Sequence, residues 1–359
     1  MSRQTIMLGN EAIARGAYEA GVKVTSAYPG TPSTEVSENV VKYEEIYAEW
    51  APNEKVATEV AIGASIAGVR SMCVMKHVGM NVAADPLYSD AYIGVNGGLV
   101  VVVADDPGIY SSQNEQDTRM VGRAAMIPVV EPSDSEEARV FTKRAYELSE
   151  KYDTPVILRT TTRLAHSQGI VNLEDRIELE DKPYERDIAK NVMMPANAIK
   201  AHLKVEARMN KMAEDADHLD INQVEYNDTG IGIITSGIPY QYVKEAVPNA
   251  SVLKLGLVHP LAKGLIQEFA SKVDRLIIVE ELEPVIEEQV KAMGIACEGK
   301  NLFTVQGEYS ANMLREKILG EKADMKQPAQ APARPPILCP GCPHRSTYSV
   351  LKKLRIHAA

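Results

Sequence analysis

The segment Gly97-Gly-Leu-Val-Val-Val-Val-Ala104 is apolar without interruption, and the turn-forming residues Asp105-Asp-Pro-Gly108 follow it directly. A strand with one face in water alternates apolar and polar residues, so a continuous apolar run indicates a strand that is covered on both faces. Strands of this kind occur in parallel sheets between two layers of helices. The run therefore predicts an α/β fold with such a sheet at its centre.

The flanking sequence supports this prediction by alternating short apolar segments with helix-favouring ones. We predict further strands at 22–28, 71–75, 127–130 and 156–159. We predict helices at 10–20 and 54–69. A third helix is expected to follow a loop at 76–79 and to end at residue 92, and a fourth to start with a capping box at 133–136 and to end at residue 152. This order is typical of a doubly wound domain, which we place at residues 1–165.

The remainder of the 359 residues exceeds what one hydrophobic core usually organises. Residues 166–226 are predicted to form a connection that contains a charged helix at 195–218. A smaller α/β domain is predicted at 227–319, with strands at 230–237, 251–255, 276–279 and 302–305. Residues 320–336 read as a Pro/Ala-rich linker, and residues 337–359 as the start of a domain that is cut short.

Composition excludes several functions. A formal net charge of −10 without a dense basic stripe disfavours nucleic acid and anionic membranes as partners. The N-terminus lacks the pattern of a signal peptide, and no apolar run is long enough to span a bilayer. We expect a cytoplasmic protein. Gly230, Gly232 and Gly237 do not have the spacing of a dinucleotide-binding fingerprint.

Glu59 lies in the segment 57–68, which is otherwise rich in small and aliphatic residues. A carboxyl group in an apolar pocket has a raised pKa and can exchange a proton near neutrality. Thiamine chemistry needs such a group beside the aminopyrimidine ring of the cofactor. The helix would also permit close approach of a second chain through its small residues Ala57, Ala61, Ala64 and Gly68. Alternatively, Glu59 is there because acidic residues favour the start of a helix.

Thr31 is predicted to be the N-cap of a helix whose first residue is Pro32, where free backbone amides suit a carboxylate. Lys76 and His77 follow a strand at the end where open α/β sheets bind ligands, although such a pair is usually solvated. For Asp105 and Asp106 we favour turn formation over a metal site.

The sequence does not decide the role of two further features. The polar loop at 111–117 either faces the cleft or lies on the surface. Cys339 and Cys342 have the Cys-x-x-Cys spacing of zinc, iron–sulfur or redox sites, yet two thiolates complete none of these. Cys73 lies in an apolar strand and is expected to be packed core, and Cys297 has no partner nearby in the sequence.

Four motifs occur in the order and spacing of one known family. They are Tyr28-Pro-Gly-Thr-Pro-Ser33, Glu59 with the Gly-Ala-x-x-Ala-Gly68 tail, the segment 76–85 that starts Lys-His-Val-Gly, and Glu280-Glu-Leu-Glu-Pro284. Together they resemble the thiamine-diphosphate-dependent 2-oxoacid:ferredoxin oxidoreductases, most of all the large (alpha) subunit of the indolepyruvate type. The resemblance covers essentially the whole chain.

The resemblance implies a pyrimidine-binding domain followed by a transketolase C-terminal-like domain. It implies that Glu59 activates the cofactor, that Thr31 lies near the substrate carboxylate, and that a pocket contains Tyr28, Pro29, Gly30, Lys76 and His77. It further implies thiamine diphosphate with Mg²⁺, iron–sulfur clusters, an aryl 2-oxoacid, coenzyme A, ferredoxin, homodimer contacts and a second (beta) subunit. In some members, cysteines matching Cys339 and Cys342 ligate a cluster.

The sequence departs from the family in what it lacks. It contains no Gly-Asp-Gly, which holds the Mg²⁺ of the diphosphate, and no ferredoxin-type cysteine run. We therefore expect the diphosphate site outside this chain and the chain alone to be inactive. Two other hypotheses remain open at this point: half of a non-redox thiamine-dependent decarboxylase or transketolase, and a non-catalytic fragment that binds a partner.

Overall fold

The computed structural model describes residues 3–322, 338 and 340–356. These residues fall into two units, which divide after Lys322. The second unit carries one described helix, α14 (His344–Lys353). The predicted linker at 320–336 lies almost entirely outside the described residues.

A seven-stranded sheet forms the centre of the first unit. Its order is β12-β6-β7-β5-β4-β2-β3, and every pairing is parallel except that of β12 with β6. The strands are β2 (Val24–Ala27), β3 (Tyr47–Trp50), β4 (Ser71–Lys76), β5 (Leu99–Asp105), β6 (Val129–Val130), β7 (Val156–Thr161) and β12 (Leu257–His259). The predicted doubly wound sheet is thus present.

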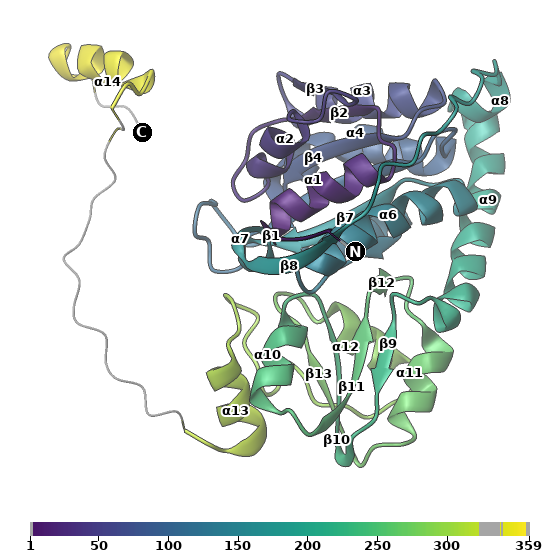
Figure 1. Ribbon diagram of the computed structural model, residues 1–359, viewed down its shortest axis with the longest axis vertical. Helices are drawn as coiled ribbons and strands as arrows, with labels where there is room; N and C mark the ends of the chain where they lie inside the picture. Colours follow the sequence, from purple (N-terminus) through teal and green to yellow (C-terminus); the bar gives the residue numbers. More distant parts are fainter. Residues whose placement is uncertain (1–2, 323–337, 339, 357–359) are drawn as a thin grey trace. The chain divides into compact units, whose positions relative to one another are not determined.

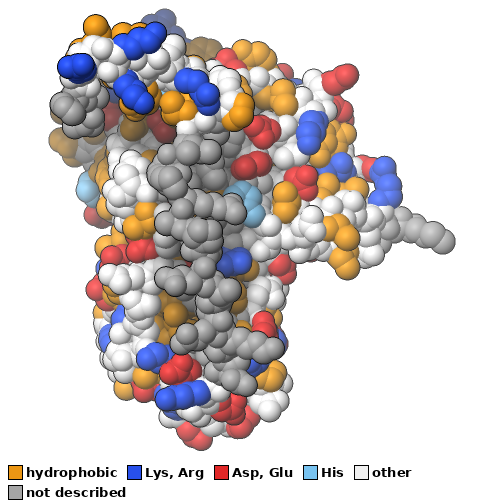
Figure 2. Space-filling view, turned by 90° about the vertical axis from the view of Figure 1, so that its left-hand side faces the viewer, with side chains coloured by type: hydrophobic (Ala, Val, Ile, Leu, Met, Phe, Trp, Pro, Cys, Tyr) orange, Lys and Arg blue, Asp and Glu red, His pale blue; other side chains and the backbone are white. Residues whose placement is uncertain are grey.

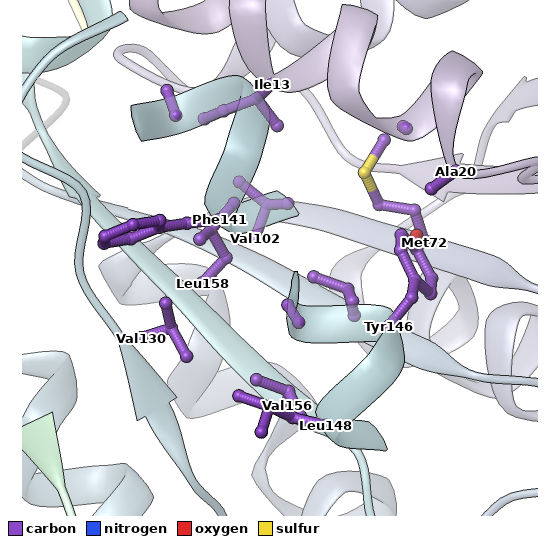
Figure 3. Close-up of a cluster of buried hydrophobic side chains, with 14 of the residues drawn as sticks. Ile13, Ala20, Met72, Val102, Val130, Phe141, Tyr146, Leu148, Val156 and Leu158 are labelled. Carbon is purple, nitrogen blue, oxygen red and sulfur yellow. The ribbon is translucent and has the colours of Figure 1, made fainter. Parts of the chain in front are cut away.

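Helices cover both faces of this sheet (Figure 1). One layer contains α1 (Gly9–Glu19), α2 (Thr34–Val40) and α6 (Ser135–Tyr152), and the other α3 (Glu54–Ile66), α4 (His77–Ile93) and α5 (Thr118–Ala125). On β5, Val100 and Val102 point into the first layer, whereas Val101 and Val103 point into the second. This alternation between two buried faces explains the uninterrupted apolar run. Figure 3 shows the first layer, where Ile13 of α1 and Phe141 of α6 lie near Val102.

A four-stranded sheet follows in the order β13-β10-β11-β9, with β9 antiparallel to β11. Its strands are β9 (Gln223–Glu225), β10 (Asp228–Ser236), β11 (Ala250–Leu255) and β13 (Arg275–Val279). The helices around it are α10 (Pro239–Ala246), α11 (Lys263–Ala270), α12 (Val285–Ala292) and α13 (Ala311–Leu319). Acidic and basic side chains both lie on the surface of this part (Figure 2). The strand predicted at 302–305 is wrong, because these residues form turns that bury Phe303 against Tyr309.

The connection between the sheets contains more structure than predicted. It comprises α7 (Thr162–His166), β8 (Gln168–Leu173), α8 (Ile188–Asn191), α9 (Pro195–Asp215) and a 3₁₀ turn at Ala216–His218. β8 pairs antiparallel with β1 (Arg3–Leu8), more than 150 residues away in the sequence. Neither strand was predicted, and neither was β3. The charged helix predicted at 195–218 is confirmed by α9 and the turn after it.

The predicted starts of α6 and α4 are wrong. α6 begins at Ser135, with Asp134 as N-cap accepting a hydrogen bond from the Glu137 amide at 2.9 Å. The Ser133 hydroxyl instead donates to the Glu137 carboxylate at 2.7 Å. α4 begins directly at His77, so no loop separates it from β4. The sequence pattern therefore places the N-cap of α6 one residue too early, at Ser133 instead of Asp134.

The two sheets share one hydrophobic cluster. It joins Val101 and Val103 of β5 to Leu253 and Leu255 of β11, and β12 crosses from the later part of the chain into the larger sheet. The domain boundaries drawn from the sequence stay a prediction. No helix among the described residues combines the length and apolar character that crossing a membrane requires.

Candidate functional site

The carboxyl ends of four neighbouring parallel strands bring most of the predicted residues to one edge of the sheet. The turn with Tyr28, Pro29, Gly30 and Thr31 follows β2, and Lys76 and His77 lie where β4 ends and α4 begins. The carboxylates at 105 and 106 end β5, and the threonines at 161 and 162 end β7. Since open α/β sheets bind ligands at this edge, this cluster is the candidate site.

The turn after β2 packs directly on Lys76. A Cβ atom added to Gly30 would lie 3.0 Å from the Cβ of Lys76, which is closer than side chains normally approach. The Gly30 amide donates to the Thr34 hydroxyl at 2.9 Å, and its carbonyl accepts from the Ser33 hydroxyl at 2.8 Å. Glycine therefore lets this turn lie against the end of β4. Tyr28, 39% exposed, borders the turn.

Lys76 and His77 are buried rather than solvated. The Lys76 ammonium donates to the Ser111 carbonyl at 2.6 Å. Burial lowers the pKa of Lys76, and the charge of Asp106 opposes this shift. His77 is 1% exposed, and its Nε2 lies 3.2 Å from the Asn114 carbonyl oxygen. Because a carbonyl only accepts, Nε2 is the donor, and the buried Nδ1 has no hydrogen-bond partner among the described residues.

Thr31 does not cap a helix. α2 begins at Thr34 with Ser33 as N-cap, so the predicted start at Pro32 is wrong. Thr31 is exposed at the candidate site, and its carbonyl accepts a hydrogen bond from the Ser111 hydroxyl at 3.1 Å. The argument that helix amides beside Thr31 would bind a carboxylate therefore fails. Only its hydroxyl remains as a candidate donor.

Glu59 lies on the exposed side of α3, and the described residues form no apolar pocket around it. The role of Glu59 as the cofactor carboxylate stays a prediction. It requires an apolar pocket that the described residues do not supply. Glu54, which the sequence reading passed over, is half-buried in the first turn of the same helix.

The Glu54 side chain lies against the first turn of α4. A Cβ atom added to Gly79 would lie 2.6 Å from the Oε1 atom of Glu54. This turn has free backbone amides, no side-chain cap and no acidic residue of its own, so a carboxylate is favoured there. The sequence signal that could have identified Glu54 is its position immediately after the helix-capping Asn53.

Asp106 organises the loop at 107–117, which covers the site. Its carboxylate accepts hydrogen bonds from the Ser111 amide at 2.9 Å, the Ser112 hydroxyl at 2.5 Å and the Thr162 hydroxyl at 2.7 Å. Burial alone would raise the pKa of Asp106, but these hydrogen bonds outweigh it and the pKa is lowered. The turn predicted after β5 is confirmed, because the Ile109 amide donates to the Asp106 carbonyl at 3.0 Å.

The acidic cluster at 280–283 has a role that the sequence did not indicate. Glu280 accepts hydrogen bonds from the α12 amides of Ile286 and Glu287, and Pro284 is the N-cap of that helix. Glu280 is also 2% exposed and forms an ion pair of 2.7 Å with the buried Arg119. The cluster therefore joins α12 to the larger sheet.

The cysteines give a mixed outcome. Cys73 is fully buried, which confirms the packed-core prediction, and burial raises its pKa to about 12. Cys339 lies outside the described residues. The sulfur of Cys342 lies 3.4 Å from Nδ1 of His344, and the described residues contain no group of three metal ligands. The metal prediction for Cys339 and Cys342 stays a prediction.

Comparisons with known proteins agree on the fold and the family. Indolepyruvate oxidoreductase subunit IorA of Archaeoglobus fulgidus is 44% identical over 98% of this chain and 61% of its own length. 2-Oxoglutarate synthase subunit KorA of Methanothermobacter marburgensis is 24% identical over 90% of this chain and all of its own length. The chain thus spans about three fifths of the length of its IorA relatives.

Among solved structures, the 2-oxoglutarate:ferredoxin oxidoreductase from Magnetococcus marinus has a TM-score of 0.75 at 20% identity, covering 89% of this chain and 65% of that one. An inactive split-gene transketolase has a TM-score of 0.57 at 14% identity, covering 88% of this chain and 97% of that one. These likenesses confirm a pyrimidine-type domain followed by a transketolase C-terminal-like one. Residues 15–228 match the family described as pyruvate flavodoxin/ferredoxin oxidoreductase, thiamine diphosphate-binding, and the chain belongs to that family.

Proposed function

We propose that this chain supplies the pyrimidine-side half of a thiamine diphosphate site in a 2-oxoacid:ferredoxin oxidoreductase. The complete enzyme would oxidatively decarboxylate aryl 2-oxoacids of the indolepyruvate type to acyl-CoA and pass electrons to ferredoxin. The observation that carries the proposal is that Lys76, beside the Gly30 turn, and His77 lie at the ligand-binding edge of the sheet, with Glu54 against the first turn of α4. The names of its IorA relatives support the substrate class.

The rest of the assembly belongs to the same proposal. The complete enzyme would lie in the cytoplasm and would also contain Mg²⁺, the diphosphate-binding part, iron–sulfur clusters and a beta subunit.

A second copy of the chain would cover the exposed side of α3, where Glu59, Gly63 and the C-cap residue Ala67 recur every fourth residue. Ala57 and Ala61, which the sequence predicted at this contact, are instead buried within the chain, so Gly63 and Ala67 would be the small residues that permit close approach. Exposure of these residues in the single chain supports this arrangement.

The residues present fit the pyrimidine end of the cofactor. His77 has a buried ring nitrogen without a partner among the described residues, and Glu54 makes no hydrogen bond or ion pair through its carboxylate there. Thiamine diphosphate supplies an electron sink for decarboxylation when bound. The chain's task would be to hold a proton on a carboxylate oxygen beside the pyrimidine ring, and the geometry favours Glu54 over Glu59 for it.

Paired substitutions in the reconstituted complete enzyme test this assignment. Glu54→Gln should slow turnover by roughly 10²–10⁴-fold, the usual effect of losing a positioned acid or base, while Glu59→Gln should stay near the wild-type rate. The opposite pattern would assign the role to Glu59. Wild-type turnover in both variants would refute the half-site on α3.

The fate of the electrons separates the redox activity from a non-redox one. With an aryl 2-oxoacid and coenzyme A, we expect ferredoxin reduction in step with release of CO₂. Release of CO₂ with an aldehyde and no reduced ferredoxin would instead indicate a non-redox decarboxylase. Calorimetric titration of the isolated chain with thiamine diphosphate and Mg²⁺ should show weak binding, because the diphosphate site is proposed to lie elsewhere.

Substrate binding tests Thr31. Thr31→Ala should raise the KM for the 2-oxoacid by roughly five- to thirtyfold, corresponding to about 1–2 kcal/mol for a lost hydrogen bond to a charged group. The value of kcat should change little. An unchanged KM would remove Thr31 from the pocket.

A further inference from the structure

The loop at 107–117 bridges the candidate site and the part of the chain that carries the four-stranded sheet. On its site-facing side, it makes three hydrogen bonds to predicted site residues. The carbonyl of Ser111 accepts from the Lys76 ammonium, the Ser111 hydroxyl donates to the Thr31 carbonyl, and the Asn114 carbonyl accepts from His77 Nε2. The position of this loop therefore determines where the side chains of Lys76 and His77 point.

The opposite side of the loop is held to the turn before α13 through Glu115. Its Oε1 atom accepts hydrogen bonds from the Gly108 amide at 2.6 Å, within the loop, and from the Gly307 amide at 2.8 Å, in the turn before α13. A carboxylate that accepts two backbone amides is a strong, charge-assisted anchor. Tyr110 makes a second contact to the same turn, through its hydroxyl and Glu308 at 3.0 Å, but Tyr110 is 65% exposed.

We propose that Glu115 is a positioning residue, which fixes Lys76 and His77 in the site by tying the loop at 107–117 to Gly307. The turn at 304–309 thereby controls the geometry of a site that it does not line. The link to substrate binding rests on the proposed function, whereas the positioning of His77 does not. Asp106 holds the part of the loop that contains Ser111 and Ser112, and Arg119 and the Glu283 amide hold its last residue, Asp117. Glu115 is the anchor next to Asn114.

The direct test observes the His77 ring in the purified chain by ¹⁵N NMR, with the resonance assigned by its loss in His77→Gln. In the wild type, the hydrogen bond to Asn114 should hold the proton on Nε2. Glu115→Ala should shift the ring nitrogens toward a mixture of tautomers. Glu115→Gln should restore the wild-type shifts, because its amide oxygen accepts the same two hydrogen bonds.

Two controls make the result specific. Tyr110→Phe removes the other contact to the same turn and should leave the His77 spectrum unchanged, and circular dichroism should show that all variants are folded. Wild-type His77 shifts in Glu115→Ala would overturn the proposal. A Tyr110→Phe spectrum altered as much as that of Glu115→Ala would also overturn it, because the loop would then respond to the loss of any contact.

A kinetic readout extends the test to the site. In the reconstituted enzyme, Glu115→Ala should raise the KM for the 2-oxoacid roughly tenfold with kcat changed less than threefold, and Glu115→Gln should recover most of the loss. If the wild-type assembly turns over no 2-oxoacid, the proposed function fails while the NMR result still decides the positioning role. A restored tautomer without a restored KM would overturn the link from positioning to substrate binding.

Discussion

Ionisable side chains lie in the interior where the two sheets of this protein meet, and Glu281 is one of them. It is 3% exposed, its Oε1 accepts a hydrogen bond from the Tyr309 amide at 2.8 Å, and its Oε2 has no partner among the described residues. Burial raises its pKa from 4.5 to about 7, although the Tyr309 amide and Arg159 oppose this shift. The folded protein therefore keeps this proton at pH values where the unfolded chain has lost it.

Glu281→Gln should make the protein more stable than the wild type above pH 7. Between pH 4.5 and 7 the folded wild type binds more protons than the unfolded chain, so this residue's contribution to stability is present at low pH and is lost as the pH rises. The full change is about 3 kcal/mol, from a rise in pKa from 4.5 to about 7. Glutamine mimics the protonated acid, so the free-energy difference between variant and wild type should grow with pH.

Urea denaturation at several pH values between 4.5 and 8 measures this difference. The exposed Glu283 offers a matched control, and Glu283→Gln should show a constant difference from the wild type. A constant difference for Glu281→Gln as well would show that the carboxylate is ionised in the folded protein across this range.

The helices pack closely where small residues permit it, and the contact between α1 and α6 depends on Gly16. A Cβ atom there would lie 2.5 Å from the Arg139 carbonyl oxygen and 2.8 Å from the Cβ of Thr142. Backbone cannot move aside at low cost, so a larger residue would force the helices apart. By contrast, Gly63 on α3 has no atom within 4 Å of its added Cβ.

Alanine substitutions at these two glycines should therefore have opposite effects on stability. Gly16→Ala should destabilise the chain by roughly 1–3 kcal/mol through overpacking. Gly63→Ala should stabilise it by roughly 0.4–1 kcal/mol, because alanine loses less backbone entropy in a helix. Thermal unfolding of the two variants checks both signs. A stable Gly16→Ala would mean that α1 and α6 do not pack as closely as described.

At the scale of the molecule, the sheets are joined by a buried ionic cluster around Arg119. Its guanidinium contacts the Asp117 carboxylate at 2.6 Å and the Glu280 carboxylate at 2.7 Å, and donates to the carbonyls of Glu281 and Glu283. All three charged side chains are at most 1% exposed. Burial alone would lower the pKa of Arg119, but the two carboxylates raise it well above its ordinary value.

Arg119→Met should destabilise the first unit by roughly 3–5 kcal/mol, because two carboxylates would remain buried without a countercharge. Chemical denaturation followed by circular dichroism measures the loss. Arg144→Met is the control, since Arg144 is 40% exposed and its partners lie on the surface, and it should change stability by less than about 1 kcal/mol. Equal effects of the two substitutions would show that the junction does not depend on this cluster.

The sequence by itself determined the five inner strands of the central sheet, most of its helices and the edge that carries the candidate site. These features come from local patterns. The valine run at 100–103 can only be covered on both faces, and turn residues after each strand place Gly30, Lys76 and Asp106 at the carboxyl edge. The family also followed from the order of short motifs, which needs no tertiary contact.

Only the tertiary structure decided which side chains are buried and which residues meet. The β1–β8 pair and the Arg119–Glu280 junction join positions more than 150 residues apart, and no local pattern records such contacts. Glu54 and Glu59 have the same chemistry and lie on the same helix, yet only Glu54 lies against the first turn of α4. The direction of a helical side chain relative to a neighbouring helix is set by packing, so the sequence could not show which of these two carboxylates meets α4.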